Sequence, residues 1–248
     1  MPTRIEWIER LPAAPISGTI LANEVLDALP CERFVIRGTA VCERAVSASA
    51  DALSLVEIPA REATRNAVHA LEAGIGAQFA EGYSHEWRSR LSPWVATLAR
   101  VLDRGLLLFI DYGLGRRELY DARHRAGTFR VHHRHRALDD ALLRPGLCDL
   151  TAWVDFTAVA EAATAEGLAL AGYTTQAHFL LGCGIERLPA ALAHEAEPAA
   201  ISAARRSGEI LRLTLPDEMG ERFKAIGFSR GIEGPLCGFA LRDLIHQL

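Results

Sequence analysis

Hydrophobic residues in this chain alternate between continuous runs and helix-like spacing. The clearest run, at 106–110, holds five consecutive apolar residues and ends in Asp111-Tyr112-Gly113. An unbroken apolar run is typical of a strand that is covered on both faces, as in a parallel sheet flanked by helices. We therefore expect a buried strand here, with polar residues at its carboxyl end.

The same kind of pattern predicts a second strand and two helices. A predicted strand at 18–22 leads into Asn23-Glu24 and then into Val25, Leu26 and Leu29 at helical spacing. Ser92-Pro93 is a helix start signal, and Gly105 is expected to end that helix. Both predicted strands end in polar residues at the edge where open α/β sheets bind ligands.

Residues 33–58 have a different pattern. Short, partly alternating stretches at 33–37, 40–48 and 53–58 are separated by Gly38 and Asp51, and 61–73 has helical spacing. This predicts antiparallel strands and a helix, inserted as a subdomain at 33–90. Later, 127–136 alternates as a strand does, 155–166 is helical, 168–171 and 223–228 are strand-like, and 189–208 is an alanine-rich helix. Residues 1–248 are expected to form a single α/β domain around this insertion.

Composition narrows the class of protein. The 248 residues are half hydrophobic and 23% charged, with a net charge of −4. No apolar run reaches the ~18–20 residues that span a bilayer, and no secretory signal is recognised at the N-terminus. We expect a soluble, cytoplasmic protein with no membrane span, and the overall charge gives no reason to expect nucleic-acid binding. Five scattered cysteines without a C-x-x-C pair predict buried free thiols in a reducing compartment.

The polar residues at the two strand ends are the first candidates for chemistry. Asn23, Glu24 and Asp27 could hold a polar or cationic substrate, or they could simply cap and complement a following helix. Asp111 is placed for a ligand, but an acid before Gly113 is equally natural as the start of a turn.

Histidines and arginines form the second group. His132, His133 and His135 lie close in sequence, but no further ligands follow at convincing spacing, so we expect no metal site. Seven arginines against two acids at 116–136 suggest either an anion-binding surface or a solvated basic loop. The G-x-G patterns at 74–76, 113–115 and 182–184 do not extend to the full phosphate-binding fingerprint, and none follows a strand and opens a helix with the spacing that such a fingerprint requires.

Taken together, several motifs resemble the MidA family of class I S-adenosylmethionine-dependent methyltransferases. The matching segments are ILANEVLDALP, FIDYG, GTFRVHHRHR, DLTAWVDFTAVAEA, GYTTQAHFLLGCG and MGERFK. The resemblance implies a partial class I (Rossmann-like) sheet with helices on both faces and an antiparallel β/helical insertion. It also implies methyl transfer to an arginine nitrogen of a partner protein. A respiratory complex subunit is a candidate partner, because mitochondrial members of the family methylate such a subunit. The oligomeric state is left open.

Family members begin with a strand, a glycine-rich loop for the cofactor and an acidic strand end for the ribose. ILANEVLDALP resembles the family's fourth strand, so we expect roughly the first third of the fold to be absent. The chain alone is then expected to bind S-adenosylmethionine weakly or not at all. The alternative function is a non-catalytic protein-binding remnant that has lost cofactor binding.

The resemblance also implies roles for particular residues. Asn23 and Glu24 match the position beside the transferred methyl group, which makes them candidates for cofactor binding and, with Asp27, for catalysis. The expected substrate-binding residues are Tyr83, Glu86, Asp111, Tyr112, Asp149 and Asp155.

Overall fold

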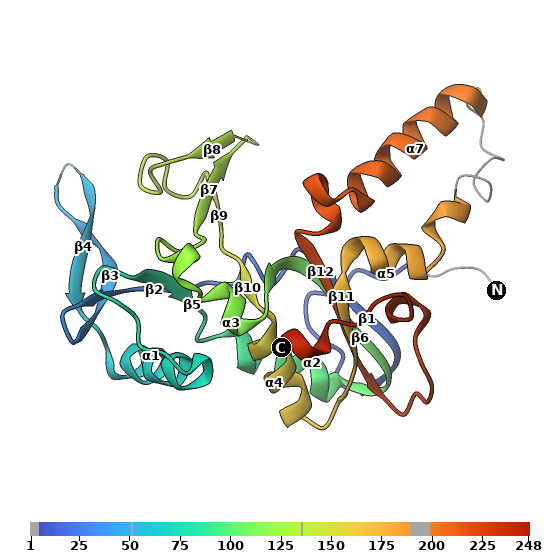
Figure 1. Cartoon of the computed structure of the whole chain (residues 1–248), viewed down its shortest axis with the longest axis horizontal. Coiled ribbons are helices and arrows are strands. Elements are labelled where there is room, and N and C mark those ends of the chain that lie inside the picture. Colours follow the sequence, from blue (N-terminus) through green and yellow to red (C-terminus); the bar gives the residue numbers. More distant parts are fainter. Residues whose placement is uncertain (1–4, 51, 135, 189–198) are drawn as a thin grey trace.

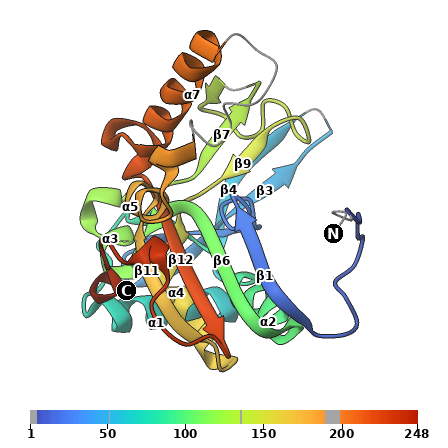
Figure 2. The same cartoon turned by 90° about the vertical axis from the view of Figure 1, so that its right-hand side faces the viewer.

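The computed structural model describes residues 5–50, 52–134, 136–188 and 199–248. Its main sheet has the order β1-β6-β12-β11, and β10 pairs with the end of β6. The strands are β1 (Ile16–Asn23), β6 (Leu102–Leu114), β10 (Val154–Asp155), β11 (Ala169–Thr175) and β12 (Phe223–Arg230). Figure 2 shows β1 and β6 side by side, with β12 and β11 beyond them.

Helices cover both faces of this sheet, as expected for the apolar run in β6. Leu107 and Phe109 face a core formed with α2 (Leu91–Val101) and α4 (Phe156–Ala165). Leu108, on the opposite face, packs in a cluster with Phe239 and with Phe179 of α5 (Gln176–Gly182). The expectation of a parallel sheet holds only for β1 and β10 against β6, because β12 runs antiparallel to both β6 and β11.

Gly105 does not end a helix, contrary to expectation. Helix α2 ends at Val101, and Gly105 lies within β6, where it pairs with Gly18. A Cβ on Gly105 would lie 1.7 Å from the Gly18 carbonyl oxygen. The glycine therefore permits close approach of β1 to β6, a tertiary requirement that local sequence does not reveal.

The helix expected directly after β1 does not form either. Residues 24–29 form bends and turns, with Glu24 at a φ of 51°. The apolar residues are nevertheless used, because Leu26 is buried in the main core and Val25 and Leu29 pack against it. Pro30 disfavours helical conformation in the residue before it, which is one local reason that a single turn does not extend.

The insertion is built on a second sheet with the order β4-β3-β2-β5. Its elements are β2 (Glu32–Arg37), β3 (Ala40–Ala48), β4 (Leu53–Pro59), α1 (Glu62–Ile75) and β5 (Ser84–Trp87). Phe34, Ile36 and Val41 on one face pack with Val68 and Leu71 of α1. The antiparallel strands and the helix agree with the sequence pattern, and the limits 33–90 for a subdomain stay a proposal.

A third sheet, β8-β7-β9, stands between the insertion and helix α7 in Figure 1. It consists of β7 (Arg130–His133), β8 (Arg136–Leu138) and β9 (Asp149–Thr151), and α7 covers Ala199–Thr214. The remaining short elements are α3 (Arg116–Leu119), η1 (Ala122–His124), η2 (Ile185–Arg187), η3 (Pro216–Gly220), η4 (Cys237–Phe239) and η5 (Ile245–Gln247). The first half of the helix expected at 189–208 lies outside the described residues. None of the helices described is long and apolar enough to cross a membrane.

Candidate functional site

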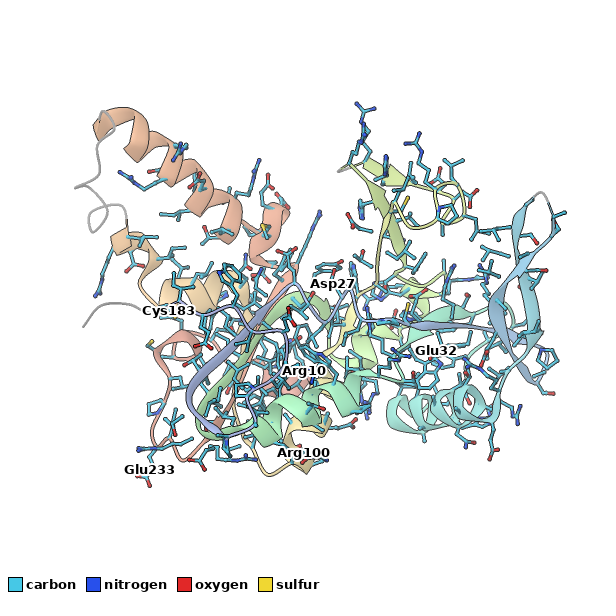
Figure 3. All side chains as sticks on the ribbon, turned by 180° about the vertical axis from the view of Figure 1, so that it is seen from behind. Arg10, Asp27, Glu32, Arg100, Cys183 and Glu233 are labelled. Carbon is cyan, nitrogen blue, oxygen red and sulfur yellow. The ribbon has the colours of Figure 1, made fainter. Side chains whose placement is uncertain are left out.

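A cavity of about 1220 Å³ lies above the carboxyl ends of β1 and β6, and we call it the strand-end cavity. Its walls come from the two strand ends, from β7 and β9, and from the residues that begin β12. The lining residues are Glu24, Asp27, Ala28, Tyr112, Arg130, His132, Cys148, Asp149, Leu150, Thr151, Trp153, Arg222 and Phe223. In Figure 3, Asp27 lies centrally between the main sheet and the other two sheets.

Asp111 lies directly beneath this cavity and is buried. Its Oδ2 accepts hydrogen bonds from the backbone N–H groups of Val25, Leu26 and Asp27, at 3.2, 2.9 and 3.2 Å. Its Oδ1 accepts a fourth from the Tyr112 N–H at 2.9 Å. Burial, and then the nearby Asp27 carboxylate, raise the pKa of Asp111 to about 7, although these N–H donors act in the opposite direction. Asp111 thus holds the turn that carries Asp27, and we propose that it acts on substrate only through that turn.

Asp27 lines the cavity and has one carboxylate oxygen without a partner among the described residues. Its Oδ2 accepts a hydrogen bond from the Tyr112 hydroxyl, and burial and this bond raise the pKa of the tyrosine. Its Oδ1 is buried and receives no hydrogen bond from the described residues. Tyr112 is fixed by an edge contact with the Phe223 ring, with centroids 5.4 Å apart. A buried carboxylate oxygen without a donor is costly, so this atom is suited to a ligand that brings an N–H group.

Asn23, Glu24 and Asp149 are more exposed. Asn23 Nδ2 donates to Glu24 Oε1 at 3.3 Å, and the Glu24 N–H donates to the Ile110 carbonyl at 2.9 Å. Asp149 pairs in register with His132 across β9 and β7. The structure therefore brings Glu24, Asp27, Tyr112 and Asp149 to one cavity, while Asn23 stands at the end of β1 beside it.

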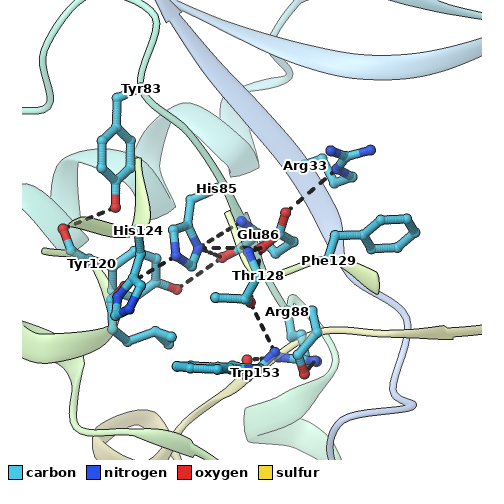
Figure 4. Close-up of polar contacts among 12 residues, drawn as sticks. Arg33, Tyr83, His85, Glu86, Arg88, Tyr120, His124, Thr128, Phe129 and Trp153 are labelled. Atoms are coloured by element: carbon cyan, nitrogen blue, oxygen red, sulfur yellow. Dashed lines mark hydrogen bonds and ion pairs between the residues drawn. The ribbon is translucent and has the colours of Figure 1, made fainter. Parts of the chain in front are cut away.

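Tyr83 and Glu86 belong to a separate buried cluster, shown in Figure 4. Glu86 Oε2 accepts from the N–H of Thr128 at 2.7 Å and from its hydroxyl at 3.2 Å. Glu86 Oε1 lies 3.6 Å from Arg33 Nε, and a Cβ on Gly127 would lie 2.4 Å from that same oxygen. The Tyr83 hydroxyl donates to the Tyr120 carbonyl at 3.0 Å. Glu86 is enclosed, whereas Tyr83 lines a separate cavity of about 440 Å³ together with Tyr120. The structure therefore does not bring Tyr83 and Glu86 to the strand-end cavity, and direct substrate binding by Glu86 has no geometric support.

Asp155 also has a role in packing. It is the N-cap of α4, accepting the Ala158 N–H at 3.0 Å, and it pairs with Arg116 Nε at 3.1 Å. Burial raises the pKa of Asp155, and the adjacent guanidinium opposes that rise. Asp155 does not line the strand-end cavity.

Several cavity residues were not among the expected ones. Arg130 and His132 reach the cavity from β7, Trp153 from the segment after β9, and Arg222 and Phe223 from the start of β12. The alternation at 127–136 does indicate that Arg130 and His132 share a face, but nothing local shows that this face meets a strand end 20 residues away in the chain.

Arg88 is a second omission. Its guanidinium donates to the carbonyls of Leu29, Asp27, Ala152 and Trp153, so it joins the turn after β1 to the segment after β9. Such a bridge between segments fixes two walls of the cavity. A substitution of lysine would remove the planar fork that makes it.

The other candidate features have structural explanations. No group of three or more metal-binding side chains occurs among the described residues, and His135 lies outside them. His133 instead contacts the Leu147 carbonyl and Arg144. All five cysteines are free, but three are half-buried and two are exposed, so the expectation of buried thiols is wrong.

One of the glycine patterns, Gly113–Gly115, lies between a strand and a short helix. Gly113 is the last residue but one of β6, which ends at Leu114, and Gly115 is the N-cap residue of α3. A Cβ on Gly113 would lie 2.2 Å from the Val154 carbonyl oxygen, and one on Gly115 would lie 2.0 Å from that of Gln247. The protein's own backbone fills the space above both glycines, so this loop does not provide a cofactor cradle.

Comparisons with known proteins show the family to which the chain belongs. Residues 1–174 match the family described as "Putative S-adenosyl-L-methionine-dependent methyltransferase". The chain belongs to this family of S-adenosyl-L-methionine-dependent methyltransferases. It is 30% identical to "Protein arginine methyltransferase NDUFAF7 homolog, mitochondrial" of Drosophila melanogaster, over 96% of this chain and 54% of that protein.

Solved structures give the same family. A Burkholderia thailandensis protein bound to S-adenosyl-homocysteine is 39% identical, with a TM-score of 0.86, over 99% of this chain and 61% of that one. A native crystal structure from the same organism gives a TM-score of 0.87 at 39% identity, over 99% of this chain and 63% of that one. The chain therefore spans between 54% and 63% of the length of these three relatives. The curated relative's name places it in mitochondria, and a cytoplasmic location for this chain stays a prediction.

Proposed function

We propose that this chain binds an arginine side chain of a protein substrate in the strand-end cavity and orients its nitrogen for methyl transfer. The observation that carries the proposal is the Asp27 carboxylate, which lines the cavity and has one oxygen, Oδ1, buried without a hydrogen-bond donor among the described residues. A guanidinium group has five N–H donors in a planar fork and stays charged at neutral pH. A guanidinium group is therefore a better partner for an unpaired carboxylate oxygen than an uncharged methyl-accepting group would be.

The residues present fit the methyl-bearing end of S-adenosylmethionine. When bound, this cofactor supplies a methyl group on a positively charged sulfur, and Asn23 and Glu24 give the end of β1 an amide and a carboxylate suited to that charge. The adenosine end has no equivalent cradle among the described residues, since protein backbone occupies the Gly113–Gly115 turn. We therefore expect the chain alone to bind this cofactor weakly or not at all.

In this proposal the chain's own groups position the acceptor and receive its proton. Asp27 Oδ1 accepts an N–H of the guanidinium, and the Tyr112 hydroxyl keeps the carboxylate oriented. As the nitrogen–carbon bond forms and the sulfur–carbon bond breaks, one N–H proton leaves, and the His132 ring nitrogen at the cavity wall is a suitable acceptor. Most of the rate enhancement in such a transfer comes from alignment.

Peptide binding tests the acceptor site without relying on cofactor. Fluorescence anisotropy would compare a fluorescein-labelled Gly-Gly-Arg-Gly-Gly peptide with its citrulline counterpart, which keeps the shape and loses the charge. We expect about tenfold tighter binding of the arginine peptide and loss of this preference in Asp27→Asn. Equal affinity for both peptides would refute the proposal. Glu186→Gln, remote from the cavity, is the matched control.

A radiolabel assay separates the enzyme from the alternative, a non-catalytic protein-binding module. The filled glycine turn favours the module for this chain alone. Time-dependent transfer of labelled methyl from S-adenosylmethionine to the arginine peptide would establish the enzyme. Peptide binding without transfer, together with no measurable cofactor binding by calorimetry, would favour the module.

A further inference from the structure

The sheet β8-β7-β9 has two chemically different faces. The register pairs Arg130 with Thr151 and His132 with Asp149, and these four residues line the strand-end cavity. Because side chains alternate along a strand, Val131 and its cross-strand partner Leu150 belong to the other face. The sheet is therefore a partition that is mainly polar toward the cavity and apolar toward the insertion, and Leu150 contributes to the lining on both sides.

A groove of about 520 Å³ lies on the apolar side, between this partition and the insertion sheet. We call it the lateral groove, and its lining includes Arg33, Arg44, Val46, Leu55, Phe129 and Leu150. Val46 and Leu55 are directly opposed on β3 and β4, yet they are 55% and 48% exposed. Leu150 is 48% exposed. Apolar side chains that gather at a groove in this way are typical of binding surfaces.

The groove also carries positive charge that is not fully neutralised. Arg44 makes no hydrogen bond or ion pair with any described residue, and its Nε is buried without a partner. The residue opposite Arg44 on β4 is Glu57, whose carboxylate accepts two hydrogen bonds from Arg37, at 2.8 and 2.7 Å. Buried donors without acceptors favour a ligand that supplies a carboxylate.

Arg33 is the second cation of the groove. Its guanidinium lies 4.6 Å from the centre of the Phe129 ring, and Glu86 Oε1 is 3.6 Å from its Nε without forming a hydrogen bond. Figure 4 shows Arg33 beside Phe129, on the outer side of the Glu86 cluster. The acids that line the groove are already engaged, Glu43 by Arg61 and Thr64, and Glu32 by Ser89.

The groove and the strand-end cavity adjoin the same residue, because Leu150 lines both. We propose that the lateral groove binds a segment of the protein substrate that carries an apolar side chain next to a carboxylate, while the acceptor side chain of the same polypeptide occupies the strand-end cavity. This inference rests on the proposed function for the identity of the ligand. The inference adds that the choice of protein substrate depends on groove residues that do not contact the arginine to be methylated.

The test uses three fluorescein-labelled peptides built on one scaffold with a single arginine. One carries Leu-Leu-Glu beyond a flexible glycine spacer, the second carries Ser-Ser-Gln at the same place, and the third ends after the arginine. Spacers of two, four and six glycines cover different reaches. Anisotropy with the full chain is expected to show at least about fivefold tighter binding of the Leu-Leu-Glu peptide at one or more spacer lengths.

Variants of the groove then locate the effect. Leu55→Glu and Arg44→Gln should each abolish the preference for Leu-Leu-Glu and leave binding of the arginine-only peptide unchanged. Leu211→Glu on α7, which replaces an exposed leucine outside both cavities, should retain the preference. Circular dichroism would verify that each variant is folded. If Arg44→Gln proves unstable, Arg44→Lys serves in its place: it keeps the charge and should retain part of the preference for Leu-Leu-Glu.

Three outcomes would overturn the inference. They are no preference in the wild-type chain, a preference that survives both groove substitutions, and self-association that Leu55→Glu abolishes in sedimentation velocity, which would make the groove an interface between copies of the chain. Failure of the proposed function is distinguishable, because the arginine-only peptide would then not bind while groove-dependent binding of Leu-Leu-Glu could still occur.

Discussion

Two buried acidic clusters in this protein come from equally suggestive sequence segments, but their surroundings differ. At the strand ends, Asp111 accepts four backbone N–H groups and thereby holds Asp27, which lines a large cavity and keeps one oxygen without a donor among the described residues. In the insertion, Glu86 is enclosed by Thr128, Gly127 and Arg33, with no room beside it. The comparison teaches that the space beside a carboxylate decides between ligand binding and structural support.

The strongest test of this comparison is Asp111→Ala. Removing the side chain leaves four backbone N–H groups without their acceptor, which we expect to lower the free energy of unfolding by about 3–5 kcal/mol. Urea denaturation measures the change. A loss below about 1 kcal/mol would mean that Asp111 does not support the turn as the geometry indicates.

The pH dependence of stability tests the coupling between the two aspartates. Asp111 has a pKa of about 7 when folded, raised from 3.8, so the folded chain holds a proton that the unfolded chain has lost between about pH 4 and 7. The contribution of Asp111 is therefore complete below about pH 4 and is lost as the pH rises through about 7, by at most about 1.4 kcal/mol per pH unit. Denaturation at a series of pH values should show this decline in the wild-type chain and a flatter profile in Asp111→Asn.

Glu86→Gln tests whether Glu86, unlike Asp27, supports the structure without binding the ligand. The substitution removes the charge that faces Arg33 but keeps the shape of the buried side chain, so we expect a loss of about 1–2 kcal/mol in unfolding free energy. Affinity for the arginine peptide should not change. If that affinity falls as it does in Asp27→Asn, the assignment of Glu86 to structural support is wrong.

The smallest expected effect is that of Glu24→Gln on acceptor binding. Glu24 is exposed, so its charge is screened and we expect a loss of only about twofold to threefold in peptide affinity. The same substitution should reduce methyl transfer by about 10²-fold wherever transfer is measurable, if Glu24 orients the acceptor in the transition state. Equal effects on binding and on transfer would leave Glu24 with a role in binding alone.

Local sequence determined most of the elements. The apolar run of β6 predicted a strand covered on both faces, and alternation predicted the insertion strands, because burial of one or both faces leaves a periodic pattern. The polar ends of β1 and β6 predicted the location of the cavity, since adjacent parallel strands end at the same edge of a sheet. The family and its cofactor were predicted from motifs such as ILANEVLDALP and FIDYG, and the family comparison confirms them.

Only the tertiary structure decided what each candidate residue contacts. The sequence around Gly105 predicts the end of a helix, but the close approach of β1 is what requires this glycine. The sequence of residues 24–29 predicts a helix, but N–H groups of this segment are instead bonded to Asp111, which is far away in the chain. Asp27, Glu86 and Asp155 are similar in sequence terms, yet Asp27 lines a cavity, Glu86 is enclosed and Asp155 caps a helix. The physical reason is that burial and hydrogen-bond partners depend on which distant segments pack together, and periodicity along the chain records that a face is covered but not by which residues.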